Sequence, residues 1–345
     1  MAADLKLPLI DLASPDRAAT AKSIRQACAD HGFFYVVNHG IEESFLQQVF
    51  HESRKFFALP QDEKMKLESK TDNRGYSPLL SHTLDSSSQV TGDLHEGIFL
   101  TCAKVRYSYF NANQWPEEEL LPCWRTTMES YYEKMLAVGK NLISLMALAL
   151  GLDDLFFEKI GAMHETLAYI RLLHYPGKTL DASSRLGASP HSDFGMATLL
   201  LTDGVPGLQI CRDKDRHPQL WEDVPHVAGA LIFNVGDLLE RWTNCLFRST
   251  MHRVLATEQE RYSIAFFING DPDCMVECLE SCCSKENPPR FPAIRGADYL
   301  QEHITAIYSR GNSIGDTGIS WGNLPPSLRP PQEGGYPPLP FIDWG

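Results

Sequence analysis

The second half of the chain contains a short apolar run at residues 261–268, which reads RYSIAFFI. Its aromatic and β-branched residues predict a strand. Arg261 and Ser263 are two residues apart, so both lie on one side of that strand, and we expect that side to face the interior of the β core. A guanidinium that faces inward is costly unless it meets an anion, and its fork geometry suits a carboxylate. The run therefore predicts a buried strand that binds a carboxylate.

Four similar runs lie upstream of this segment, separated by Gly, Pro and Asp turns. They cover residues 167–175, 196–201, 207–211 and 230–235. Each is short and rich in β-branched, leucine and aromatic residues. Several short strands with frequent turns favour a β-sandwich or barrel over a parallel doubly wound sheet.

The first half of the chain is predicted to be mainly helical. Helices are expected at 18–30, 42–57 and 122–150, with short strands at 7–12 and 32–40. The polar stretch 72–91 predicts a long loop, and such loops are often lids or binding segments. We divide the chain into an N-terminal mixed α/β segment (1–110), central helices (111–165), a core (166–310) and a proline-rich C-terminal tail (311–345).

Composition restricts the classes of partner. The 345 residues include 31 Lys and Arg against 44 Asp and Glu, a formal charge of −13 at pH 7. This acidic balance argues against nucleic acid or an anionic membrane as the main partner. The sequence also lacks an apolar stretch of about 18 residues and a targeting pattern, and its nine cysteines indicate reduced thiols. We therefore expect a cytoplasmic protein that acts on a small molecule, with a monomer as the default.

Two further motifs indicate a metal site. His191 and Asp193 are two residues apart, so their side chains can converge on one point, and His252 follows after nearly sixty residues. Two imidazoles and one carboxylate form the facial triad of non-haem Fe(II) oxygenases, which leaves three positions open. The inward pair Arg261 and Ser263 strengthens this interpretation. A 2-oxo-dicarboxylate would chelate the metal through its 2-oxo acid end while Arg261 holds its distal carboxylate.

These motifs resemble those of the Fe(II)- and 2-oxoglutarate-dependent dioxygenase superfamily, in its isopenicillin N synthase-like branch, which includes plant enzymes of specialised and hormone metabolism. The resemblance extends from about residue 7 to about residue 308. It is carried by Pro8–Leu12 and 27–40, by the Arg74-Gly75-Tyr76 turn, and by the core motifs His191-Ser192-Asp193, Gly207-Leu208-Gln209, Asn234-Val235-Gly236-Asp237, His252-Arg253-Val254 and Arg261-Tyr262-Ser263.

The resemblance implies a mainly β fold, a double-stranded β-helix (jelly-roll, cupin-like) core wrapped by N-terminal and central helices. It assigns His191, Asp193 and His252 to Fe(II), and Arg261, Ser263 and Tyr175 to the distal carboxylate of 2-oxoglutarate. The implied reaction uses O₂ to oxidise a small organic metabolite, with hydroxylation as the default, and releases succinate and CO₂. Ascorbate is an optional aid to turnover.

Three residues of this chain need a separate interpretation. Leu173 stands where plant members of the family carry asparagine, so one polar contact to 2-oxoglutarate is in question. Phe267 shares the inward face of Ser263 and either contacts the substrate or packs in the core. Glu96 lies on a segment expected to cross the pocket mouth. It is expected to be an exposed strand residue, with pairing to a cationic substrate as the alternative.

Two other functions stay open at the level of the sequence. The chain could be an iron oxidase of the same branch that does not use 2-oxoglutarate. It could also be a catalytically silent protein that binds a metal or a small acid on this fold. The intact triad and the Arg261–Ser263 pair argue against the silent protein, because neither is useful without the other.

Overall fold

The computed structural model describes residues 5–68, 75–81, 92–101, 113–177, 186–213 and 218–308. Most of the predicted loop at 72–91, including Arg74, lies outside these ranges. Residues 102–112 and the proline-rich tail from residue 311 also lie outside them.

An eight-stranded sheet forms one wall of the core, in the order β1-β2-β10-β7-β12-β5-β4-β3. Its strands are β1 (Leu9–Asp11), β2 (Phe33–Val37), β3 (Gly75–Ser77), β4 (Glu96–Thr101), β5 (Leu167–Tyr175), β7 (Ala197–Thr202), β10 (Leu231–Val235) and β12 (Arg261–Gly270). The β1–β2 pair is parallel and the other pairs are antiparallel. Strands from the N-terminal segment thus extend the sheet at both edges of the core.

A second, four-stranded antiparallel sheet supplies the other wall, in the order β6-β11-β8-β9. Its strands are β6 (Leu186–His191), β8 (Leu208–Cys211), β9 (Glu222–Asp223) and β11 (Met251–Leu255), while β13 (Met275–Val276) and β14 (Ile294–Arg295) form a separate pair. Side chains from both walls line one pocket. Two facing sheets around a pocket are the arrangement of a double-stranded β-helix.

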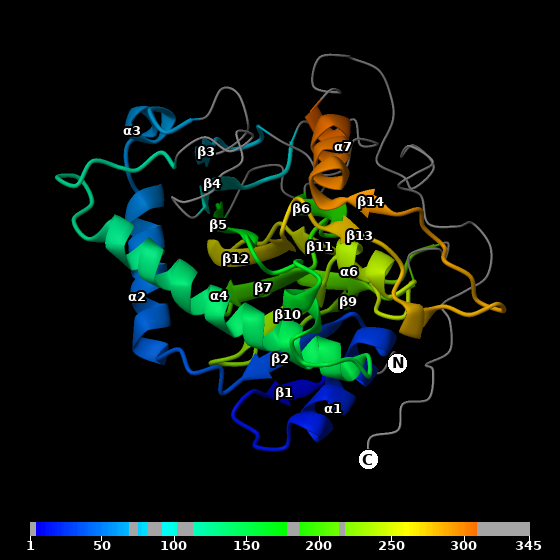
Figure 1. The fold of residues 1–345 in the computed structure, drawn as a ribbon. Helices are drawn as coiled ribbons and strands as arrows, with labels where there is room; N and C mark the ends of the chain where they lie inside the picture. The colour runs from blue at the N-terminus through cyan, green and yellow to red at the C-terminus, as the bar shows by residue number, and fades with distance from the viewer. Residues whose placement is uncertain are drawn as a thin grey trace.

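The described residues also form helices around the two sheets (Figure 1). They are α1 (Arg17–Asp30), α2 (Glu43–Phe57), α3 (Gln61–Met65), α4 (Trp124–Ala149), α5 (Phe156–Lys159), α6 (Asp237–Trp242) and α7 (Gly296–Tyr308), with a 3₁₀ turn at Glu280–Cys282. The long helix α4 contacts α1, α2 and β12. Gly139 permits its close approach to the sheet, because a Cβ atom there would lie 2.3 Å from Cδ1 of Ile268. None of the helices in the described ranges is long and apolar enough to cross a bilayer.

The predicted helices and the five predicted strands of the core are present, with ends that differ by a few residues. The structure adds β6 and α7, which the sequence pattern did not predict. β6 reads LGASPH, and its Gly187 and Pro190 are unusual inside a strand. Its pairing with β11 is interrupted by register shifts. A strand of this composition depends on its neighbours more than on its own propensity.

Candidate metal centre and its pocket

Strand pairing brings the three predicted metal ligands together. His191 ends β6 and lies opposite His252 of β11 in the ladder, so the centroids of their rings are 4.2 Å apart. Asp193 follows β6 by two residues, and its Oδ1 is 3.7 Å from Nε2 of each histidine. One ligand atom from each residue lies within 4.8 Å of the other two. A single metal ion can therefore contact all three.

A hydrogen bond at Nδ1 fixes the orientation of each histidine ring. Nδ1 of His191 lies 2.7 Å from the carbonyl of Ser189, and Nδ1 of His252 lies 3.1 Å from that of Thr250. A carbonyl only accepts, so Nδ1 carries the proton and Nε2 of each ring is available to a metal.

The carboxylate of Asp193 is oriented in the same way. Its Oδ2 accepts hydrogen bonds from Thr198 Oγ1 at 2.6 Å and from Asn234 Nδ2 at 2.7 Å, while Oδ1 faces the two histidines. Outer hydrogen bonds of this kind orient metal ligands and are part of most metal sites.

The protonation states also suit a metal. The pKa of His191 is lowered to about 4, first by burial and then by the nearby His252. Burial alone would raise the pKa of Asp193, but the two histidines and the hydrogen bonds from Thr198 and Asn234 outweigh it, so the pKa is lowered. At neutral pH the site therefore offers a neutral His191 imidazole and an ionised carboxylate. These are the forms that bind metals, and two nitrogens with one oxygen suit non-haem Fe(II).

Arg261 lies at the start of β12 beside this centre and is almost fully buried, with 1% of its surface exposed. Its Nε donates to the carbonyl of Val205 at 3.2 Å, but its Nη1 has no hydrogen-bond partner. Tyr175 is its partner in the β5–β12 ladder, and the guanidinium carbon lies 4.8 Å from the centroid of that ring. Ser263 follows on the same face, and all three residues line the pocket that contains the triad.

Apolar side chains form much of the remaining wall of this pocket. They come from both sheets, and they are Phe33, Leu173, Ala188, Leu200, Leu208, Val254, Ala265 and Phe267. Leu173 is buried opposite Ser263, so the position that carries asparagine in plant relatives is apolar here. Phe267 lines the pocket and stacks on Tyr169 with ring centroids 4.8 Å apart.

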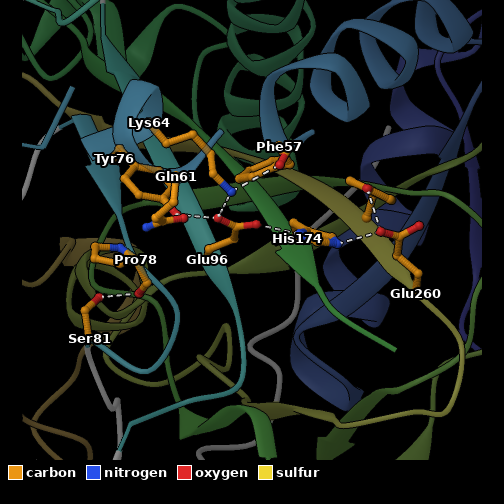
Figure 2. A network of polar contacts seen from close by, with 10 residues as sticks. Phe57, Gln61, Lys64, Tyr76, Pro78, Ser81, Glu96, His174 and Glu260 are labelled. Carbon is orange, nitrogen blue, oxygen red and sulfur yellow. Dashed lines mark hydrogen bonds and ion pairs between the residues drawn. The ribbon is translucent and has the colours of Figure 1, made fainter. Parts of the chain in front are cut away.

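The expectation that Glu96 is exposed is wrong. Only 7% of its surface is exposed, and it does not line the pocket. Figure 2 shows its carboxylate enclosed by partners from other elements: Oε2 contacts Lys64 Nζ at 2.7 Å and the hydroxyl of Tyr76, and Oε1 lies 2.7 Å from Nδ1 of His174. With both oxygens occupied, Glu96 stabilises the fold and is unavailable to a cationic substrate. Periodicity missed this because the partners lie far away in the sequence.

The sequence reasoning missed other residues of the pocket. Arg171, His95, Thr198 and Asn234 all line it. One signal could have found Arg171: it precedes Leu173 by two residues and Tyr175 by four, so strand alternation places it on the same face of β5.

Comparisons with known proteins agree with this geometry. Residues 7–118 match the family described as non-haem dioxygenase in morphine synthesis N-terminal, and residues 167–270 match the 2OG-Fe(II) oxygenase superfamily. Kihadalactone A synthase of Citrus sinensis is 41% identical over 85% of this chain and 90% of its own length. A 2-oxoglutarate-Fe(II) type oxidoreductase of Emericella nidulans is 33% identical over 89% of this chain and 91% of its own. The crystal structure of a full-length Neurospora crassa protein in complex with alpha-KG is 27% identical, covers 89% of this chain and 98% of that one, and superposes with a TM-score of 0.79.

The fold and the triad define a non-haem iron enzyme. The chain belongs to the 2-oxoglutarate–Fe(II) oxygenase superfamily. It is a 2-oxoglutarate-dependent dioxygenase that oxidises a small organic molecule and releases succinate and CO₂, with Fe(II) at the His191–Asp193–His252 site and 2-oxoglutarate as cosubstrate. The predicted fold class, reaction class and cofactors are thereby confirmed.

Proposed function

We propose that this enzyme hydroxylates its substrate and that Arg261, Ser263 and Tyr175 bind the distal carboxylate of 2-oxoglutarate. The observation that carries the proposal is the unpaired Nη1 of Arg261, in a side chain with 1% of its surface exposed. A buried cation without an anion is unfavourable, so the folded protein is prepared for an anionic ligand at this point. A carboxylate matches the donor fork of a guanidinium.

The ladder between β5 and β12 supports the assignment of the other two residues. Tyr175 lies opposite Arg261, and its ring packs against the guanidinium, which limits the directions in which that group can point. Ser263 brings a hydroxyl to the same face two residues along the strand. Together the three residues line the pocket that contains the triad.

Bound iron supplies the activation of O₂ and of the 2-oxo acid, which is chemistry that no side chain can perform. The chain's own residues position the reactants. Asp193 and the two histidines would hold the metal, and all three line the pocket, so the cosubstrate and substrate would reach the metal through it. The apolar walls around Leu173, Leu200 and Val254 exclude water from that approach. We also assign Phe267 to substrate contact. Its side chain lines the pocket, and its ring stacks on that of Tyr169.

The test of the anchor is an anaerobic titration of the Fe(II)-loaded protein with 2-oxoglutarate, followed by the visible charge-transfer band of the chelate. The wild type should show a saturable band. Arg261→Gln should bind 2-oxoglutarate about 10- to 100-fold more weakly, because charge-assisted hydrogen bonds contribute about 1.5 to 3 kcal/mol. Arg261→Lys should be intermediate, since it keeps the charge and loses the fork.

Arg212→Gln is the matched control, because Arg212 forms an exposed ion pair with Glu222 at 2.6 Å outside the pocket. It should titrate like the wild type. An unchanged affinity for 2-oxoglutarate in Arg261→Gln would refute the anchoring role.

We further propose a monomer located in the cytoplasm. Large exposed apolar side chains of the described residues, such as Leu9, Leu155 and Met275, belong to separate elements, which argues against one extended apolar interface. The eight cysteines within the described ranges are all free, which suits a reducing compartment. Light scattering on the purified protein tests the first proposal, and imaging of a fluorescent fusion tests the second.

A further inference from the structure

The pocket contains a second guanidinium, which belongs to Arg171 on β5. Arg171 is half-buried, and its Nε is a buried atom without a hydrogen-bond partner. Within the described residues no carboxylate lies at ion-pairing distance from it. Its guanidinium carbon lies 4.7 Å from the ring centroid of Phe99. The cation is thus sheltered by an aromatic face but has no anion.

A neutral histidine holds this guanidinium in place. Nδ1 of His95 lies 2.6 Å from the carbonyl of Gly187, so that nitrogen carries the proton. Nε2 of the same ring then accepts a hydrogen bond from Nη2 of Arg171 at 3.0 Å. His95 therefore orients Arg171 without neutralising its charge. This differs from the buried Lys64, whose charge is paired with Glu96.

Arg171 lies away from the proposed 2-oxoglutarate anchor but close to the metal site. In the β5–β12 ladder Arg261 pairs with Tyr175, whereas Arg171 pairs with Ala265. The two positions are four residues apart along each strand, about 13 Å at the usual rise. Arg171 nevertheless lines the same pocket as the metal ligands His191, Asp193 and His252. Arg261 and Arg171 thus present two separate guanidinium groups to the pocket that contains the triad.

The charges of the loaded site leave Arg171 uncompensated. The two charges of Fe(II) and the charge of Arg261 are balanced by Asp193 and by the doubly charged 2-oxoglutarate. The charge of Arg171 remains, and neither the aromatic ring of Phe99 nor the neutral His95 cancels it. A half-buried cation without a counterion favours an anion that arrives with a ligand.

We infer that Arg171 is a specificity-determining residue that binds a carboxylate of the substrate, so the enzyme acts on a small carboxylic acid. The inference rests on the proposed function, because it takes Arg261 to be occupied by 2-oxoglutarate. Arg171 directs a planar pair of donors at the acid group, and His95 holds those donors in place. The carbon to be oxidised would then belong to the part of the acid that lies nearer the metal.

The experiment measures the binding of matched carboxylic acids and amides to the Fe(II) protein, without O₂ and with saturating 2-oxoglutarate. Acetate, benzoate and cinnamate are each compared with their primary amides by calorimetry. At least one acid should bind the wild type about 10-fold or more tighter than its amide, since charge-assisted hydrogen bonds are the stronger kind. Arg171→Gln should abolish this preference, Arg171→Lys should keep part of it, and Arg212→Gln should keep all of it.

The titration with 2-oxoglutarate is run on the same samples and separates the two proposals. In Arg171→Gln the affinity for 2-oxoglutarate should equal that of the wild type, which also shows that the variant is folded. Equal binding of acids and amides, no binding of either, or an acid preference that persists in Arg171→Gln would overturn the inference. A wild-type protein that fails to bind 2-oxoglutarate would instead overturn the proposed function.

Discussion

Two buried groups of charged side chains in this enzyme differ in how far their hydrogen-bonding capacity is used. Around Glu96, both carboxylate oxygens have partners, and Lys64 contacts both Glu96 and the carbonyl of Phe57 (Figure 2). In the pocket, Nη1 of Arg261 and Nε of Arg171 have none. The first group is complete when the chain folds, whereas the second keeps donors that we propose are used by ligands.

The difference follows from the cost of burying charge. A buried ion pair holds a fold in register only if both partners are satisfied, because a lone buried charge costs several kcal/mol. The Glu96 group joins α3, β3, β4 and β5, so it fastens the N-terminal segment to the core. We propose that bound anions compensate the unpaired donors of Arg261 and Arg171 beside the triad.

The largest expected effect comes from removing the metal ligand Asp193. Asp193→Ala removes a ligand that both histidines face, so turnover should fall by far more than the roughly 100-fold seen for outer partners of a metal. Bound iron per chain should fall as well, while circular dichroism stays that of the wild type. Asp223→Ala is the control, since Asp223 is exposed and bonds only Gln209 across the β8–β9 pair. An Asp193→Ala variant with wild-type turnover would contradict the triad.

A second substitution removes the buried ion pair between Glu96 and Lys64. Glu96→Gln leaves the charge of Lys64 buried without its counterion, so the free energy of unfolding should fall by about 3 to 5 kcal/mol. Glu63→Gln removes a pair with Lys66 of similar length, 2.6 Å, in which the side chains are 28% and 59% exposed. That control should cost no more than about 1 kcal/mol. Equal costs in urea denaturation would show that burial of the Glu96 pair is irrelevant.

A smaller effect is expected at Thr198, which contacts the metal ligand Asp193. Thr198→Val removes the hydroxyl that donates to Asp193 Oδ2 at 2.6 Å and keeps the shape of the side chain. Affinity for Fe(II) should fall by about 10- to 100-fold, the usual cost of losing an outer partner. Thr202→Val, on the same strand but bonded to His226, is the control and should leave iron affinity unchanged. A competition assay with a chelator measures both, and equal affinities would remove Thr198 from the site.

The smallest expected effect is a dependence on acid pH. The folded-state pKa of Glu96 is lowered, because its three partners outweigh burial, which by itself would raise the pKa. A lowered pKa contributes stability above the unfolded-state pKa, and that stability is lost as pH falls through the folded-state value. The difference in unfolding free energy between the wild type and Glu96→Gln should therefore be constant near neutral pH and shrink below about pH 4. A difference that grows on acidification would contradict a lowered pKa of Glu96.

Local patterns predicted much of the fold and most of the site residues. Period-two alternation placed Arg261 and Ser263 on an inward face, and the family resemblance pointed to Tyr175. The structure puts all three around the pocket. Their roles toward 2-oxoglutarate stay predictions. The same alternation also places Arg171 on the inward face of β5, with Leu173 and Tyr175. Glu96 was misplaced because exposure of a strand residue depends on what packs over it, which alternation does not report.

The sequence by itself determined the residue types and short spacings of the chemistry: a histidine and an aspartate two apart, an arginine and a serine two apart, and the runs that form the central strands. These are local properties, since one strand sets them. Tertiary structure decided which distant residues meet. The β6–β11 ladder brings His252 to His191, and Glu96 meets Lys64 and His174 across 32 and 78 residues of sequence. Such contacts form only when the whole chain packs, because burial sets both the cost of a charge and the partner that must compensate it.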